Sequence, residues 1–271
     1  MKIVFIFITI VNLLHASSSI QKHYSKSKTN IYQPISYMKF LEAKKCFKQV
    51  FLTLKNHHCL SSLEFKLTEF NQTIIIEDKK RQGGGFFIIR DNPKAQNMLS
   101  IPHRFSDTHT GNIGFKMMNN DPFKASAFST VHRKTMDIAH NPYNFFTAFH
   151  LAFASLFPKE FIYQLHGFSN KKRKESLAQK TSMITSTGSK FYSHQAIAIC
   201  QHLKLAHKMC LVYGKTTHEL GGTTNAQRNL LNLEGFKHFI HIEMNKSFRT
   251  ELLNDTKARQ IFSSILLLDT L

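Results

Sequence analysis

From residue 98 to the end of the chain, strand-type patterns alternate with helical patterns, and this alternation constrains the fold more than any other feature. The expected strands are Met98–Pro102, Ala125–His132, Phe161–His166, Thr181–Thr187, Lys208–Tyr213 and Phe236–Glu243. The expected helices are Asn144–Leu156, Ser193–Ala206 and Ser247–Leu268. Because alternating strands and helices build sheets that are covered on both sides, we expect an α/β fold. Its sheet should be mixed and mostly parallel, with helices on both faces.

The preceding residues are dominated by strand patterns. A helical pattern covers Ser36–Asn56, and strand patterns cover Leu63–Phe70, Thr73–Glu77 and Phe86–Arg90. The glycine-containing segment Asp78–Gly85 predicts a hairpin between the last two strands. Since no repeat or low-complexity linker divides the chain, we expect residues 22–271 to form a single domain.

Residues 1–21 have the layout of a secretory signal peptide. Lys2 is followed by an apolar run from Ile3 to Leu14 and then by the small residues Ala16 to Ser19. About a dozen apolar residues is well below the ~20 that a membrane-spanning helix needs. We expect a soluble, periplasmic or secreted protein that begins near residue 19 to 22, with an uncleaved anchor as the alternative.

Lysine and arginine outnumber aspartate and glutamate by 36 to 17, which gives a net charge of +19. The cations are scattered along the chain, apart from the run from Lys171 to Lys174, which we interpret as a solvated loop. This distribution favours acidic substrates or an anionic cell-envelope polymer as partners, rather than nucleic acid.

Four cysteines in an exported chain permit disulfides. None of them forms a C-x-x-C pair, so zinc bound by cysteine is not expected. Local Cys46–Cys59 and Cys200–Cys210 bridges are our hypothesis, and other pairings or free thiols stay open.

Polar residues follow the ends of several predicted strands, the place where open α/β sheets bind ligands. His103 and Asp107 follow one strand, and His166 ends another just before a glycine. Imidazole and carboxylate groups are zinc ligands, so these three residues are candidates for a site with a fourth position open to water. The alternatives are that His103 and Asp107 cap a turn and a helix, and that His166 is a hydrogen-bonded core residue.

The last strand contains a candidate general base. Its alternation places Phe239, His241 and Glu243 on one face. An acid on a buried strand is costly unless it is paired or catalytic, so Glu243 is our candidate base. The alternative is an ion pair with Arg249 or Lys246.

Three arginines are candidates for binding a substrate carboxylate, namely Arg133, Arg228 and Arg249. Arg133 is equally well explained as a surface cation, and the nearby Asp137 as a cap. The glycine-rich segment Glu219–Asn225 before Arg228 allows a close approach of the backbone to a ligand or forms a simple turn. It lacks the lysine and spacing of a phosphate-binding loop, so we do not predict nucleotide binding.

The order of these motifs resembles the zinc carboxypeptidase-like superfamily, and within it the N-formylglutamate amidohydrolases and phage-type poly-γ-glutamate hydrolases. The motifs in question are Pro102-His103 with a nearby acid, Asp137, His166-Gly167, Gly221-Gly222, and Ile242-Glu243 followed by Arg249. The resemblance covers roughly residues 98–250. It implies a hydrolase-like domain in which His103, Asp107 and His166 hold zinc and Glu243 is catalytic.

The chain departs from that pattern in two places. Carboxypeptidases space the first histidine and acid as H-x-x-E, whereas His103 and Asp107 are spaced as H-x-x-x-D. The amidohydrolase pattern Asp-x-Asn-Arg is replaced by Asp137-Ile-Ala-His140. These departures bear on Asp107 as a ligand and on the identity of the substrate arginine.

We therefore expect an exported zinc-dependent hydrolase of amide bonds near a carboxylate, such as those of peptides, N-acyl amino acids or cell-wall stem peptides. Zinc would activate water, and Glu243 would take up its proton. Two alternatives are a periplasmic metal-binding protein and a basic module that binds an anionic polymer without a metal. The metal content of the purified protein separates the last alternative from the other two.

Overall fold

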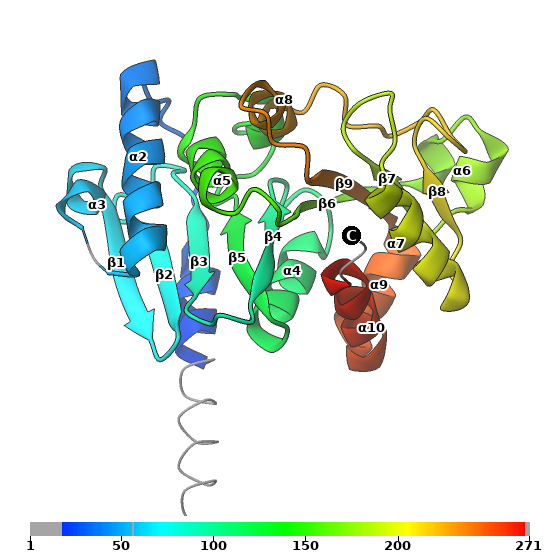
Figure 1. Cartoon of the computed structure of the whole chain (residues 1–271), viewed down its shortest axis with the longest axis horizontal. Helices are drawn as coiled ribbons and strands as arrows, with labels where there is room; N and C mark the ends of the chain where they lie inside the picture. Colours follow the sequence, from blue (N-terminus) through cyan, green and yellow to red (C-terminus); the bar gives the residue numbers. More distant parts are fainter. Residues whose placement is uncertain (1–17, 56, 269–271) are drawn as a thin grey trace, which may run out of the picture.

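The computed structural model describes residues 18–55 and 57–268. Within these residues the strands form one nine-stranded sheet in the order β1-β2-β3-β5-β4-β6-β9-β7-β8, which crosses the molecule from β1 to β8 (Figure 1). The central strands are all parallel, and they are β5 (Phe123–Phe128), β4 (Gln96–Ile101), β6 (Ile162–Phe168) and β9 (Phe239–Asn245). The expected mixed sheet, mostly parallel in its centre, is confirmed.

The two flanks of the sheet contain the antiparallel pairs. One flank is β1 (Phe65–Phe70), β2 (Thr73–Asp78) and β3 (Phe86–Arg90), of which β3 pairs antiparallel with β5. The hairpin predicted between the last two of these strands is present. The other flank is β7 (Met183–Ser186), antiparallel to β9, and β8 (Cys210–Val212), parallel to β7.

Helices cover both faces of the sheet, as predicted. The helices packed on one face are α2 (Tyr37–Thr53), α3 (His58–Ser62), α5 (Phe145–Leu156) and α8 (Ala226–Leu233). Those packed on the other face are α4 (Thr110–Asn120), α7 (His194–Leu205), α9 (Lys246–Asn254) and α10 (Thr256–Leu267). The short elements η1 (Ile138–His140), η2 (Asn170–Lys172) and α6 (Ser176–Lys180) lie in the connections. Each face buries its own apolar cluster, so the sheet separates two cores.

Several predicted boundaries are wrong. The strand expected over Ala125–His132 ends at Phe128, because the backbone then turns and the Ser129 hydroxyl donates to the carbonyl of Val131. The single helix expected over Ser247–Leu268 is two helices, since the Asp255 carboxylate accepts hydrogen bonds from two backbone N–H groups at the start of α10.

His166 and Glu243 lie inside their strands, not at the ends. β6 and β9 each continue for two residues past them, and the two residues face one another in the parallel register. The strand expected over Thr181–Thr187 is shorter, and the segment after Glu219–Asn225 forms helix α8, which was not expected. Arg228 therefore lies on a helix.

The described part of the N-terminal segment packs against the sheet and its helices. Residues 18–26 are helical, with Ile20 and Tyr24 buried in the core. The Arg104 guanidinium lies 3.5 Å from the centre of the Tyr24 ring and donates to the Tyr24 carbonyl. Most of the predicted signal peptide, residues 1–17, lies outside the described residues. Within the described ranges, every helix is too short or too polar to span a membrane.

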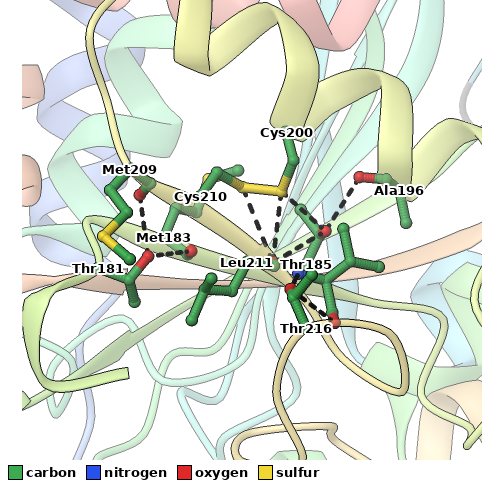
Figure 2. The surroundings of a disulfide bond; sticks show 10 residues. Thr181, Met183, Thr185, Ala196, Cys200, Met209, Cys210, Leu211 and Thr216 are labelled. Carbon is green, nitrogen blue, oxygen red and sulfur yellow. Dashed lines mark hydrogen bonds between the residues drawn. A yellow bond between two sulfur atoms is a disulfide. The ribbon is translucent and has the colours of Figure 1, made fainter. Parts of the chain in front are cut away.

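Both expected disulfides are present. Cys46 of α2 is bonded to Cys59 of α3 at one end of the sheet. Figure 2 shows Cys200 of α7 bonded to Cys210 of β8, with the Thr185 hydroxyl beside the sulfur atoms. This second bond ties the edge strand β8 to the helix that covers it, and edge strands are the part of a sheet that most needs such cover.

Candidate metal centre

Three candidate ligands meet at the carboxyl ends of β4 and β6. His103 and Asp107 lie in the turn between β4 and α4, and His166 lies in β6. The His103 and His166 Nδ1 atoms are 3.1 Å apart, and each is 3.4 Å from the Asp107 Oδ2 atom. Their side chains are 3%, 5% and 11% exposed, so the group is nearly closed to solvent.

The spacing of these three atoms suits one small cation. Zinc binds histidine and carboxylate ligands at about 2.0–2.2 Å, and in a tetrahedral site such ligands lie about 3.3–3.6 Å from one another. The observed separations of 3.1, 3.4 and 3.4 Å are close to that range. Three electron-rich atoms at this distance repel each other unless a proton or a metal ion lies between them.

Asp137 fixes the orientation of His103. Its Oδ1 atom is 2.8 Å from the His103 Nε2 atom. A carboxylate can only accept, so His103 donates through Nε2–H, and in the neutral ring this leaves the lone pair on Nδ1, which faces Asp107 and His166. Carboxylates that hold a histidine ligand in this way commonly orient it and increase its basicity. Our sequence reasoning treated Asp137 as a cap or as part of a motif, because 34 residues separate it from His103.

The charges in this group shift the pKa values of its members. Burial opposes ionisation of Asp107, but its interactions with the His103 and His166 rings outweigh it and hold the Asp107 pKa far below its usual range. The pKa of Asp137 is lowered in the same way, against its own burial, by His103. Burial lowers the pKa of His166 to about 4, so this imidazole is neutral at pH 7. Burial opposes protonation of His103, but Asp107 and Asp137 outweigh it and raise the His103 pKa. Because zinc binds ionised carboxylates and neutral imidazole, a metal would have to displace the proton that these acids favour on His103.

The predicted alternation on the last strand is confirmed. Phe239 packs in the cluster under α2 and α5, whereas Ile240 and Ile242 pack in the opposite cluster. The Glu243 Oε1 atom is 3.3 Å from His241 Nε2, and the ring of His241 packs on that of His166 with centroids 4.4 Å apart.

Glu243 has one oxygen, Oε2, that is buried without a hydrogen-bond partner. Among the residues that the structure describes, no ion pair within 4 Å joins Glu243 to Arg249 or Lys246, and the side chain in contact with its carboxylate is His241. An unpartnered carboxylate oxygen is costly to bury, and it is able to accept a proton or a hydrogen bond from a ligand.

Arg249 packs against Gly167, the residue that follows His166. It is 5% exposed, its Nη1 group donates to the carbonyl of Met244, and its Nε atom is buried without a partner. Burial lowers its pKa, while the charges of Asp107 and Glu243 act in the opposite direction. The guanidinium fits only because residue 167 is glycine, since a Cβ atom there would lie 1.8 Å from Nη1.

The other two candidate arginines lie farther from the three ligands. Arg133 donates through Nε to Asp137 at 2.7 Å and is 47% exposed, so it lies at the outer side of the site. Arg228 contacts Thr187 and Asn229 instead, and it lines a separate cavity of about 260 Å³ together with Phe191 and Tyr192.

The glycine-rich segment Glu219–Asn225, which precedes α8, contacts His241 and His140 beside the site. Gly222 has a φ of +61°, and a Cβ atom on it would lie 2.8 Å from the ring of His241. The Thr224 hydroxyl is 3.0 Å from His140, which in turn is 2.9 Å from Asp137. Gly222 thus packs closely against His241 of β9. The expected approach of these glycines to a ligand stays a prediction.

The chain matches no family model and no curated protein sequence. Among solved structures, it is similar in fold to an N-formylglutamate amidohydrolase from Ralstonia eutropha, with 9% identity and a TM-score of 0.44 over 64% of this chain and 92% of the other. It is also similar to an aspartoacylase family protein from Mesorhizobium loti, with 10% identity and a TM-score of 0.43 over 76% and 71%. A zinc-free form of the protein YNDL gives 12% identity and a TM-score of 0.42 over 68% and 88%. The first of these belongs to a group that the motifs resemble, and at these identities the likeness concerns the fold alone.

Proposed function

We propose that this protein is a zinc-dependent hydrolase of amide bonds near a carboxylate, in peptides, N-acyl amino acids or cell-wall stem peptides. The observation that carries the proposal is the spacing of the His103, His166 and Asp107 ligand atoms, at 3.1 to 3.4 Å from one another. A pure binding protein has no need of an unpartnered, buried carboxylate oxygen beside these ligands, and Glu243 supplies one.

The residues of the chain divide the work as follows. Zinc, when bound by His103, Asp107 and His166, supplies Lewis acidity that polarises a carbonyl group and acidifies water. Glu243 takes a proton from water through Oε2 and returns it to the leaving amine. His241 holds the other carboxylate oxygen of Glu243 in place.

Substrate enters from the side of Asp137, since its side chain is 28% exposed while those of His103 and His166 are nearly buried. Arg133 lies at that entrance and carries the charge needed to bind a substrate carboxylate. Arg249 contributes positive charge near Asp107 and Glu243. Arg228 would act only on a substrate long enough to reach the cavity that Arg228 lines.

A second candidate function, binding of an anionic envelope polymer, has one observation in its favour. A cavity of about 620 Å³ lies between residues 18–27 and the first hairpin. Its cationic lining residues are Lys22, Lys26, Lys66, Lys79 and Arg81. They make up five of the thirteen lining residues, against 36 of 271 in the chain, so positive charge is concentrated there. Retention of full polymer binding after metal removal would favour this candidate.

The test of the hydrolase proposal combines metal content, stability and turnover. The purified protein should carry close to one zinc, and His103→Ala or His166→Ala should each lose most of it. Glu243→Gln should keep zinc and melting temperature, because it preserves size and hydrogen bonding. Its turnover of an N-acyl amino acid panel should fall by about 10²–10⁴-fold. A Glu243→Gln protein that melts much lower and loses zinc would contradict the catalytic role.

We also propose that the chain is exported. The composition of residues 1–21 and the two disulfides support this, since disulfides persist in oxidising compartments. Fusion of residues 1–21 to a reporter should carry that reporter out of the cytoplasm. Retention of the fusion inside the cell would overturn the proposal.

A further inference from the structure

We propose that Gln164 is a positioning residue that sets the tautomer of His166 and thereby presents its Nδ1 atom to the metal centre. Gln164 lies two residues before His166 in β6, so both side chains lie on the same face of the strand. It is fully buried, and its Oε1 atom is 2.8 Å from His166 Nε2. The effect of this contact on zinc binding rests on the proposed function. The assignment of the His166 tautomer does not depend on it.

The orientation of the Gln164 amide follows from a backbone group on one side of it. Gln227 donates through its NH₂ group to the carbonyl of Ile138, at 2.8 Å. Because that carbonyl can only accept, the remaining Gln227 oxygen accepts, and it takes a hydrogen bond from the Gln164 NH₂ group at 3.3 Å. The oxygen of Gln164 must then face His166.

A second backbone group gives the same result independently. The Arg228 backbone N–H donates to Asn225 Oδ1 at 3.0 Å, at the start of α8. This leaves the Asn225 NH₂ group to donate, and its acceptor is Gln164 Oε1. A reversed Gln164 amide would bring two NH₂ groups together in a dry interior.

A third connection runs through helix α5. His150 Nδ1 is 2.6 Å from the carbonyl of Phe146 and donates to it, so His150 Nε2 accepts from the Ser100 hydroxyl at 2.7 Å. The Ser100 oxygen is then free to accept from the Gln164 NH₂ group at 3.2 Å. Three fixed backbone groups thus require one orientation of Gln164.

The consequence for His166 is a single tautomer. An amide oxygen accepts only, so His166 carries its proton on Nε2 and directs the lone pair of Nδ1 toward His103 and Asp107. In the other tautomer, a lone pair on Nε2 would face the lone pairs of the Gln164 oxygen. The network therefore keeps the lone pair of His166 Nδ1 available as a ligand before a metal binds.

The first experiment uses the wild-type chain without metal. Long-range ¹H–¹⁵N spectra of the histidine rings at pH 7.5 should assign His166 as the Nε2–H tautomer. Assignment of His166 as the Nδ1–H tautomer overturns the proposal, whether or not the protein is a hydrolase.

The second experiment compares two equally sized substitutions of buried glutamines. Gln164→Met removes the acceptor, so His166 should no longer keep one tautomer and zinc affinity in chelator competition should fall by about 10–100-fold. Gln195→Met is the control, because Gln195 is also buried but bonds to Tyr163 on the opposite face of the sheet. It should leave both readouts unchanged.

A conservative variant separates positioning from packing. Gln164→Glu keeps an acceptor oxygen opposite His166 and should retain the Nε2–H tautomer. Unchanged tautomer and affinity in Gln164→Met would overturn the proposal. If the wild-type protein binds no zinc, the hydrolase proposal fails, while the wild-type tautomer still decides the role of Gln164.

Discussion

At the scale of single residues, the most restrictive contact is the one between Gly167 and Arg249. Gly167 donates its backbone N–H to Asp107 at 3.0 Å, and the absence of a Cβ atom leaves room for the guanidinium. The cation in turn lies near the charges of Asp107 and Glu243. One glycine therefore lets a candidate ligand, a candidate base and a buried cation share the same small volume.

We predict that Gly167→Ala destabilises the protein by about 1–3 kcal/mol, the usual cost of forcing extra volume into a packed interior. The buried Arg249 side chain must move, and it loses its bond to Met244. Chemical unfolding of both single variants and of the double variant Gly167→Ala/Arg249→Ala measures this. In the Arg249→Ala background the alanine should cost little, and an equal cost in both backgrounds would contradict the steric explanation.

The candidate ligands could be predicted from the sequence, whereas the residues that orient them could not. His103, Asp107 and His166 stood out because histidines and an acid followed strand patterns. The structure brings them together, and their role as ligands stays a prediction. Gln164 gave no such signal, and Asp137 stood out only as a cap or as part of a motif, because a hydrogen bond between distant segments depends on register and loop path.

At the scale of elements, the long periodic segments were predictable and the short ones were not. Helices α2, α5 and α7 and strands β1, β2 and β3 were recognised, since burial imposes a clear period on them. Helix α4 was not predicted, because it contains Gly111 and Gly114, which lower helix propensity. In the structure these glycines allow close packing against Arg104 and Ile101. Helix α8 was missed because it is only eight residues long, which is too short for its apolar positions to show a clear helical period.

Element ends were decided by side-chain hydrogen bonds. Ser36, Asn144 and Ser193 accept from backbone N–H groups at the starts of α2, α5 and α7, and each lay at the start of its predicted helix. Asp255 has the same role in the middle of an apolar pattern, where periodicity alone indicates a continuous helix. Caps inside a periodic segment therefore need to be considered before a long helix is predicted.

At the scale of the whole molecule, a fully buried histidine makes stability depend on pH. Burial lowers the pKa of His150 to about 4, against its usual value of 6.5. Between these values the unfolded chain binds more protons than the folded one, so stability falls as pH falls from 6.5 to 4. The contribution of this group amounts to about 3 kcal/mol over that interval.

We predict that His150→Gln removes this part of the pH dependence. The free energy of unfolding, measured by denaturant titration between pH 7 and 4, should fall less steeply in the variant than in the wild type. Other groups, including His166, titrate in both proteins, so the difference between the two slopes reports His150 alone. Parallel slopes would show that His150 is protonated equally in both states.

The long sequence separation of the candidate ligands has a consequence for how the protein would acquire its metal. Sixty-three residues separate His103 from His166, so the unfolded chain holds no preformed site, and loading follows folding. Protein sites of this kind bind several divalent ions, and the ion that fills them in the cell is selected partly by supply. The metals available in the compartment where this chain folds would therefore decide which ion occupies the site. A protein produced in a foreign host can be expected to bind the divalent metal that is most available in that host.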